Sequence, residues 1–177
     1  MYNEKMKRRV LSKLENSLRI YEKLIFTEVG QLRDVRSLYT HEHFRSVPDS
    51  VTEPITNGTV WGDEWGSLWV KGSFEITDEL DGKPLYALSE CGGVEQLFFI
   101  NGVPKGIFNS KNREHIGGVH CSQYIGCFKK GECIELAFEC YAGHYDPDTD
   151  PYNNYLEPDG SQTFSHCYNG VKISPAR

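Results

Sequence analysis

Hydrophobic residues near the N-terminus repeat with the period of a helix. From Val10 onward the apolar side chains stand three or four positions apart, with charged residues between them. They are Leu11, Leu14, Leu18, Tyr21 and Ile25. This spacing gathers them on one helical face. The pattern predicts an amphipathic helix whose apolar stripe packs against the domain that follows or against a neighbouring domain.

The next stretch changes character twice. We expect residues 28–39 to form a second short helix. Residues 46–58 then read as a connector, because prolines, an asparagine and a glycine that favour turns follow one another closely: Pro48, Pro54, Asn57 and Gly58. We therefore divide the chain near residue 46, into an N-terminal helical segment over residues 1–45 and a second domain over residues 46–177.

Beyond the connector, hydrophobic and polar residues alternate with the period of a β-strand. Apolar side chains occupy every second position in residues 68–76 and again in residues 133–140. Residues 85–88 form a shorter strand bounded by turn residues. One more strand is expected within residues 162–173.

A hairpin is predicted around Asn101 and Gly102. These two residues tolerate the positive φ angles of a type I′ turn, so residues 97–100 should pair with residues 103–108. Short strands joined by turns, with no helical pattern between them, indicate a mainly β fold. We expect an antiparallel β-sandwich of the jelly-roll, galactose-binding-like kind, preceded by the N-terminal amphipathic helical segment.

Composition and charge restrict the partners. The chain has 177 residues and a formal net charge of −6, so it offers nucleic-acid phosphates no general electrostatic attraction, and no nucleic-acid partner is expected. No stretch approaches the roughly 20 apolar residues of a membrane span, and no apolar signal-peptide core follows the basic start. We therefore expect no membrane partner and a cytoplasmic location.

The cysteines are expected to be free thiols, since no secretion signal accompanies them. They also lack the Cys-x-x-Cys spacing that a structural zinc site usually has, so we predict no metal and no cofactor in this chain. The six are Cys91, Cys121, Cys127, Cys133, Cys140 and Cys167.

Three tryptophans, Trp61, Trp65 and Trp69, follow one another at intervals of four residues. They have two interpretations. Large aromatic residues beside glycine usually fill the space where a loop closes over two sheets, which favours packing in the core or between domains. The alternative is a flat platform for carbohydrate, because the apolar face of a sugar ring stacks on an aromatic ring.

An acidic loop later in the chain carries a weak candidate calcium site. Its oxygen-bearing residues match positions 1, 3, 5, 9 and 12 of the EF-hand calcium loop: Asp146, Asp148, Asp150, Asn154 and Glu157. The sixth position needs glycine for a sharp turn and holds Pro151 instead, whose φ is fixed negative. A solvated acidic loop is therefore the favoured interpretation.

Several motifs occur in a fixed order around the tryptophans. The run from Trp61 to Gly72 precedes the run from Gly93 to Pro104, then Arg113 to His115, then the strand end from Glu139 to His144. Over roughly residues 55–145 this order resembles the N-terminal domain of the cytoplasmic and vacuolar-type α-mannosidases of glycoside hydrolase family 38 and of their bacterial homologues.

The resemblance implies a non-catalytic domain that docks on the catalytic domain of the same polypeptide. In that family a His-x-Asp motif helps to hold zinc in the catalytic barrel. The only residues with that spacing in this chain, His144 and Asp146, stand at the end of the stretch that resembles the non-catalytic N-terminal domain. Zinc and hydrolysis would then belong to residues outside this chain, which we expect to be a fragment of a longer glycosidase. The alternative hypothesis is an autonomous carbohydrate-binding module with a tryptophan platform. A second copy of the chain is a further candidate partner.

Overall fold

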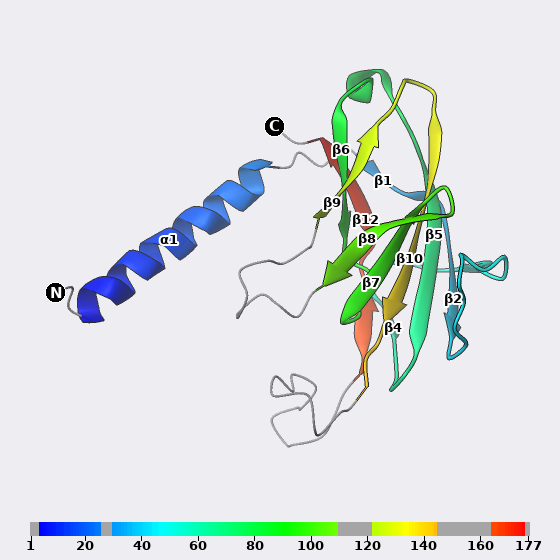
Figure 1. The fold of residues 1–177 in the computed structure, drawn as a ribbon, viewed down its shortest axis with the longest axis horizontal. Coiled ribbons are helices and arrows are strands. Elements are labelled where there is room, and N and C mark those ends of the chain that lie inside the picture. The colour runs from blue at the N-terminus through cyan, green and yellow to red at the C-terminus, as the bar shows by residue number, and fades with distance from the viewer. Residues whose placement is uncertain (1–3, 26–29, 110–121, 145–163, 176–177) are drawn as a thin grey trace.

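The computed structural model describes residues 4–25, 30–109, 122–144 and 164–175. It consists of one long helix followed by a body of β-strands (Figure 1). The predicted amphipathic helix is confirmed as α1 (Glu4–Ile25). No helix among these residues is long and apolar enough to cross a membrane.

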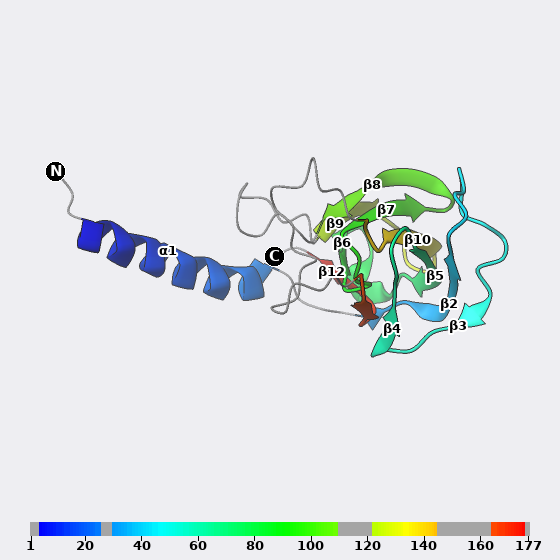
Figure 2. The same cartoon turned by 90° about the horizontal axis from the view of Figure 1, so that it is seen from below.

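Helix α1 extends away from the strands in both views of the molecule (Figures 1 and 2). Residues 4–17 of the helix are all exposed, and Leu11 and Leu14 of the apolar stripe are 57% and 55% exposed. The packing expected between this part of the stripe and the sandwich is therefore not formed in the structure.

The larger sheet has six antiparallel strands. Its two central strands, β5 and β10, pair along nine residues, from Ser67 opposite Tyr141 to Glu75 opposite Cys133. In spatial order the strands are β3 (Glu53–Pro54), β2 (Arg33–Thr40), β5 (Ser67–Glu75), β10 (Cys133–Tyr141), β7 (Glu95–Ile100) and β8 (Val103–Asn109).

A second sheet faces the first, and a short pair of strands lies beside them. The four-stranded sheet consists of β1 (Gly30–Gln31), β12 (Val171–Pro175), β6 (Pro84–Ser89) and β9 (Ser122–Cys127). The two-stranded sheet pairs β11 (His166–Tyr168) with β4 (Thr59–Trp61). A single 3-10 turn, η1 (Asp78–Leu80), precedes β6. The predicted mainly β fold, an antiparallel sandwich preceded by a helix, is confirmed.

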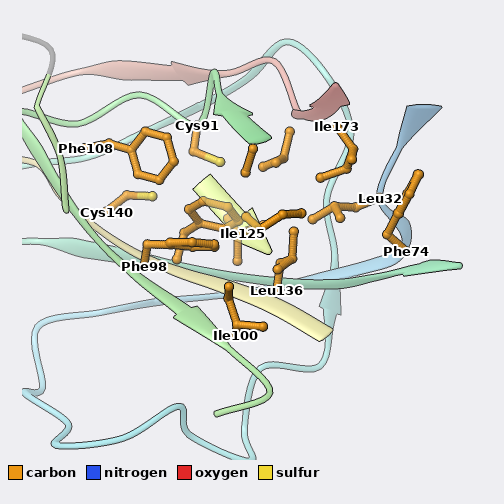
Figure 3. Close-up of a cluster of buried hydrophobic side chains, with 14 of the residues drawn as sticks. Leu32, Phe74, Cys91, Phe98, Ile100, Phe108, Ile125, Leu136, Cys140 and Ile173 are labelled. Carbon is orange, nitrogen blue, oxygen red and sulfur yellow. The ribbon is translucent and has the colours of Figure 1, made fainter. Parts of the chain in front are cut away.

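The core fills the space between the two larger sheets. The predicted alternation of β5 and β10 holds, with Val70, Leu136 and Phe138 buried on the inward face. The Phe98 ring stacks on the Phe138 ring with centroids 5.1 Å apart, and Phe108 meets Phe98 edge-on at 5.6 Å. Figure 3 shows part of this cluster.

The expected helix over residues 28–39 is wrong. Residues 28 and 29 lie outside the described residues, and the rest of this stretch forms β1 and β2. A shift in the pairing of β2 with β5 between Arg33 and Arg36 marks a bulge at Asp34, whose φ is 51°. The extra residue puts Leu32 and Val35 against the same core cluster, while Leu38 packs on the cluster of the other face. The apolar positions therefore fall three apart, as they do in a helix. Strand β2 lies before residue 46, yet it belongs to the large sheet; the division of the chain into domains stays a prediction.

The predicted hairpin is confirmed. Strands β7 and β8 pair with each other and are joined by a turn at Asn101 and Gly102, whose φ angles are 48° and 75°. The single C-terminal strand expected within residues 162–173 is instead two strands, β11 and β12, separated at Gly170, whose φ is 98°. Strands β4 and β9 were not predicted, because neither has a regular alternation.

The cysteines of the described residues are free thiols. Cys91 and Cys140 are buried in the core, whereas the other three are exposed: Cys127, Cys133 and Cys167. Burial raises the pKa of the Cys140 thiol, and a hydrogen bond with Cys91 raises it further. The Cys140 thiol is therefore protonated, and both core cysteines pack as small apolar side chains.

Candidate functional site

The three tryptophans have different surroundings. Trp61, at the end of β4, is buried, and its indole N–H donates to the backbone oxygen of Cys91 at 2.9 Å. Trp69, in the middle of β5, is completely buried. Trp65 is 51% exposed. The structure therefore does not bring the three together as one platform.

Trp69 lies on the outer face of the six-stranded sheet. It belongs to a second apolar cluster that includes Val51 and Phe99, and the Phe44 ring meets its indole edge-on with centroids 6.2 Å apart. Among the described residues its indole N–H has no hydrogen-bond partner. Trp69 therefore has the packing role that the favoured interpretation assigned to the tryptophans.

Trp65 stands on a short loop between β4 and β5, residues 62–66, which we call the tryptophan loop. The Trp65 N–H donates to Gly143 O and the Ala142 N–H donates to Gly66 O, each at 2.8 Å. Both bonds tie the loop to the chain that leaves β10. Trp65 itself has a φ of 68°, the left-handed region that non-glycine residues rarely adopt.

Two glycines permit the backbone conformation and close contacts of the tryptophan loop. Gly62 has a φ of 105°, and a β-carbon there would overlap the backbone oxygen of Phe164. A β-carbon on Gly66 would overlap the Tyr39 hydroxyl and lie 2.7 Å from Asp63 Oδ1. Gly62 is thus required by the close approach of a backbone oxygen, and Gly66 by the side chains of Tyr39 and Asp63 that pack against it.

A polar cluster holds the other side of the loop. The Tyr39 hydroxyl and the Nε2–H of His41 both donate to Asp63 Oδ1, the histidine at 2.8 Å. The Tyr39 hydrogen bond, followed by His41, holds the pKa of the Asp63 carboxyl below its usual value. Burial and then the Asp63 carboxylate raise the pKa of Tyr39 to about 12. An ionised carboxylate therefore accepts both bonds at neutral pH.

Trp65 forms an aromatic patch with the end of β10. Its ring stacks on His144 with centroids 4.1 Å apart and planes 14° from parallel, and the Tyr141 hydroxyl lies 2.7 Å from His144 Nδ1. We call Trp65, Tyr141 and His144 the Trp65 platform. Two carboxylates lie near it: Glu95 is opposite Tyr141 in the β7–β10 pairing, and Glu64 precedes Trp65. Burial, and then these two charges, raise the pKa of Tyr141 to about 12.

This arrangement suits recognition of a polar ring with an apolar face. An exposed indole offers the flat surface on which sugar rings stack, and carboxylates accept hydrogen bonds from hydroxyl groups. The sequence did not indicate Tyr39 and His41, because β2, which contains Tyr39 and ends directly before His41, was expected to be a helix. For His144 the sequence offered one signal: it is the last residue of the final motif in the family resemblance.

Metal binding finds no support in the residues that the structure describes, where no three His, Cys, Asp or Glu side chains gather in ligating positions. The weak calcium candidates of the acidic loop lie outside the described residues: Asp146, Asp148, Asp150, Asn154 and Glu157. The calcium site stays a prediction.

Comparison with known proteins shows the fold. No family model matches the sequence, and no curated protein sequence matches it. Among solved structures, the chain is similar to a β-glucuronidase from Ruminococcus gnavus in complex with uronic deoxynojirimycin, at a TM-score of 0.50 and 11% identity over 86% of this chain and 29% of the other. A β-glucuronidase from Faecalibacterium prausnitzii gives the same TM-score, identity and coverage of this chain, with 32% of its own length matched. The chain thus spans about a third of each enzyme.

The resemblance to the family 38 α-mannosidases is wrong. No family model or curated sequence supports it, and the structural likeness is to β-glucuronidases. The motifs that carried it have structural roles in this sandwich: the Trp-Gly run closes the end of the sheets, and Asn101-Gly102 makes a hairpin turn. Zinc in an absent catalytic domain was implied by that resemblance alone and loses its basis.

Replacing Gly62 by alanine should strongly destabilise the protein. The added β-carbon overlaps a backbone oxygen that cannot move aside, and the positive φ adds strain, so we expect a loss of roughly 2 to 4 kcal/mol in the free energy of unfolding. Gly58→Ala is the control, because Gly58 also has a positive φ, of 87°, but open space around it. Its cost should be about 1 kcal/mol. Urea unfolding measures the free energy of unfolding of both variants. If the two variants lost the same amount, the close approach of the Phe164 backbone oxygen to Gly62 would be contradicted.

The hydroxyl of Tyr39 should stabilise the protein at neutral pH and much less in acid. The folded pKa of Asp63 lies below its ordinary 3.8, so its stabilising contribution is present above about pH 4 and is lost as the pH falls through the lowered pKa. The difference in unfolding free energy between the wild type and Tyr39→Phe should therefore shrink between pH 6 and about pH 2.5. Tyr124→Phe, whose hydroxyl contacts the thiol of Cys127, should show no such change. If the difference in unfolding free energy between the wild type and Tyr39→Phe stayed constant with pH, a hydrogen bond from Tyr39 to an ionised Asp63 would be excluded.

Proposed function

We propose that this chain is a non-catalytic β-sandwich domain of a glycoside hydrolase, packed beside the catalytic domain of the same polypeptide. The likeness in fold to the two β-glucuronidases carries this proposal. It covers most of this chain and about a third of each enzyme, so a parent protein of that size would have room for a catalytic domain outside these residues.

Two of the carboxylates at this end of the sandwich are unsuited to acid catalysis. A glycosidase needs a pair of carboxyl groups, one of which has a raised pKa so that it can donate a proton. Asp63 has a lowered pKa and is held by two hydrogen bonds. Glu90 is paired with Lys172 at 3.1 Å. Neither is suited to be the proton donor.

The purified chain should not hydrolyse p-nitrophenyl β-glucuronide. Released nitrophenol would be measured against a buffer blank at several protein concentrations. A Glu95→Gln variant controls for contamination, because a contaminating enzyme would give the same rate in both preparations. A rate that rises with protein concentration and falls in the variant would overturn the non-catalytic role.

A second candidate function is carbohydrate binding at the Trp65 platform. The observation that favours it is the strained backbone of an exposed aromatic residue: a left-handed φ costs a non-glycine residue about 1 to 2 kcal/mol. The buried half of the side chain packs on His144 and Tyr141, and the exposed half is open to a ligand. The hydrogen bonds to residues 142 and 143 hold the indole in place before any ligand arrives, which lowers the entropy lost on binding.

Sugar binding should be visible in tryptophan fluorescence. Trp61 and Trp69 are buried, so a change in emission on adding methyl β-glucoside or methyl β-glucuronide should come from Trp65. We expect saturation in the millimolar range, as for a binding free energy of about −4 kcal/mol. Trp65→Phe should remove the signal, and His144→Ala should weaken binding by removing the stacked ring. An unchanged wild-type spectrum up to tens of millimolar sugar would rule this function out.

A further inference from the structure

Among the described residues, Cys91 and Cys140 are the two cysteines that the fold buries. Both are 0% exposed and belong to the main core cluster. Figure 3 shows them at the same end of that cluster, next to Phe108. Cys140 lies on β10 of the six-stranded sheet, whereas Cys91 follows β6 of the four-stranded sheet by two residues. The two thiols therefore come from opposite sides of the sandwich.

Strand register and hydrogen bonds place one thiol against the other. Gln96 lies directly opposite Cys140 in the β7–β10 pairing, so the two side chains project from the same face of the sheet. The buried side chain of Gln96 also binds residues on both sides of Cys91. Its amide N–H donates to Gly92 O at 2.9 Å, and its amide oxygen accepts from the Ser89 hydroxyl. The segment that carries Cys91 is therefore held over Cys140.

The buried hydroxyl of Tyr168 lies near both sulfurs. Burial, and then Cys91 and Cys140, raise the pKa of Tyr168. The hydrogen bond between the two thiols agrees with this arrangement. In such an apolar site a thiolate is unfavourable, so the pair persists as a dithiol until an oxidant reaches it.

The position of the pair gives a bond between the two sulfurs a structural consequence. A single buried cysteine acts as a small apolar side chain, whereas two in contact can also be joined covalently. Cys91 O accepts the indole N–H of Trp61, and Cys140 directly precedes Tyr141 of the Trp65 platform. A disulfide would therefore fasten together the two segments that support the candidate site.

We propose that Cys91 and Cys140 are a redox-sensitive pair, which a small-molecule disulfide converts into a disulfide bond between the two sheets. One cysteine attacks a sulfur of the reagent as a thiolate, which gives a mixed disulfide and releases one thiolate of the reagent. The second cysteine attacks the mixed disulfide and releases the other. Each departing thiolate takes up the proton that the attacking thiol has lost. The two cysteine sulfurs are thereby oxidised and the two sulfurs of the reagent are reduced.

Burial of both thiols determines the rate of this reaction. The reagent reaches them only when the end of the sandwich opens locally, so the bond forms slowly in the native protein. Urea at concentrations below the unfolding transition should accelerate it, because such concentrations raise the population of locally opened states.

The disulfide should stabilise the protein. It closes a loop of about 50 residues that contains β7, β8 and β9. Closing a loop of this length restricts the unfolded chain much more than the folded chain. The oxidised protein should therefore unfold at a temperature about 5 to 10 °C higher than the reduced protein.

Oxidation of the full chain tests the proposal. One sample of the native protein is incubated with oxidised glutathione, and a second is kept reduced with a phosphine. Remaining thiols are then blocked with iodoacetamide, and peptides are identified by mass spectrometry. The oxidised sample should contain a peptide pair joined through Cys91 and Cys140. The exposed cysteines should carry glutathione or the blocking group: Cys127, Cys133 and Cys167.

Variants assign the thermal shift to this pair. Cys91→Ala and Cys140→Ala should each abolish the difference in unfolding temperature between oxidised and reduced samples. The difference is taken within each variant, so a variant of lower starting stability still gives a valid result. Cys133→Ala is the matched control, because Cys133 lies on the same strand as Cys140 but is exposed. This variant should retain the full shift.

Three results would overturn the proposal. In the first, the exposed cysteines react while Cys91 and Cys140 stay unlinked, even in urea below the unfolding transition. In the second, the joined peptides form only from the fully unfolded chain, which means that the fold does not bring the thiols together. In the third, the bond forms but lowers the unfolding temperature, which means that the native core does not accommodate it.

Discussion

The pairing of β5 with β10 is the interaction on which the rest of the structure depends. Its nine residue pairs are the longest ladder among the described residues, and it occupies the centre of the larger sheet. Its inward side chains, such as Val70 and Phe138, supply the main core. Its outward side chains include Trp69, around which a second apolar cluster forms. One ladder thus organises the apolar packing on both faces of the sheet.

The end of the same ladder determines where the candidate site lies. Ser67 and Tyr141 are the last pair, so the tryptophan loop enters β5 directly beside the point where the chain leaves β10. The loop is fastened to that exit by backbone hydrogen bonds and to β2 by the bond between Tyr39 and Asp63. Surface chemistry at this end of the sandwich is therefore a consequence of strand register.

Local patterns in the sequence predicted the fold well where a single strand, turn or helix pattern ran through the whole segment. The alternation of β5 and β10, the Asn101-Gly102 turn and the spacing of α1 are of this kind. Prediction failed at β2, because a bulge at Asp34 and apolar clusters on both faces of the sheet together gave the strand a helical spacing of apolar residues. The site was harder, since the roles of Tyr39 and His144 come from contacts with Asp63 and Trp65 that only the folded chain creates. A shared motif order also misled the family assignment, since turns and sheet closure impose similar residues on unrelated sandwiches.

The left-handed backbone of Trp65 sets stability and surface chemistry in opposition at one position. Glycine would adopt that φ without strain, but it would supply neither the ring that stacks on His144 nor the exposed aromatic face. A chain that keeps an indole there meets a requirement for one or both of these. Sequences of close relatives would reveal that requirement directly: glycine or asparagine at this position would mark sandwiches that retain the fold without the aromatic surface, and tryptophan would mark those in which the surface is used.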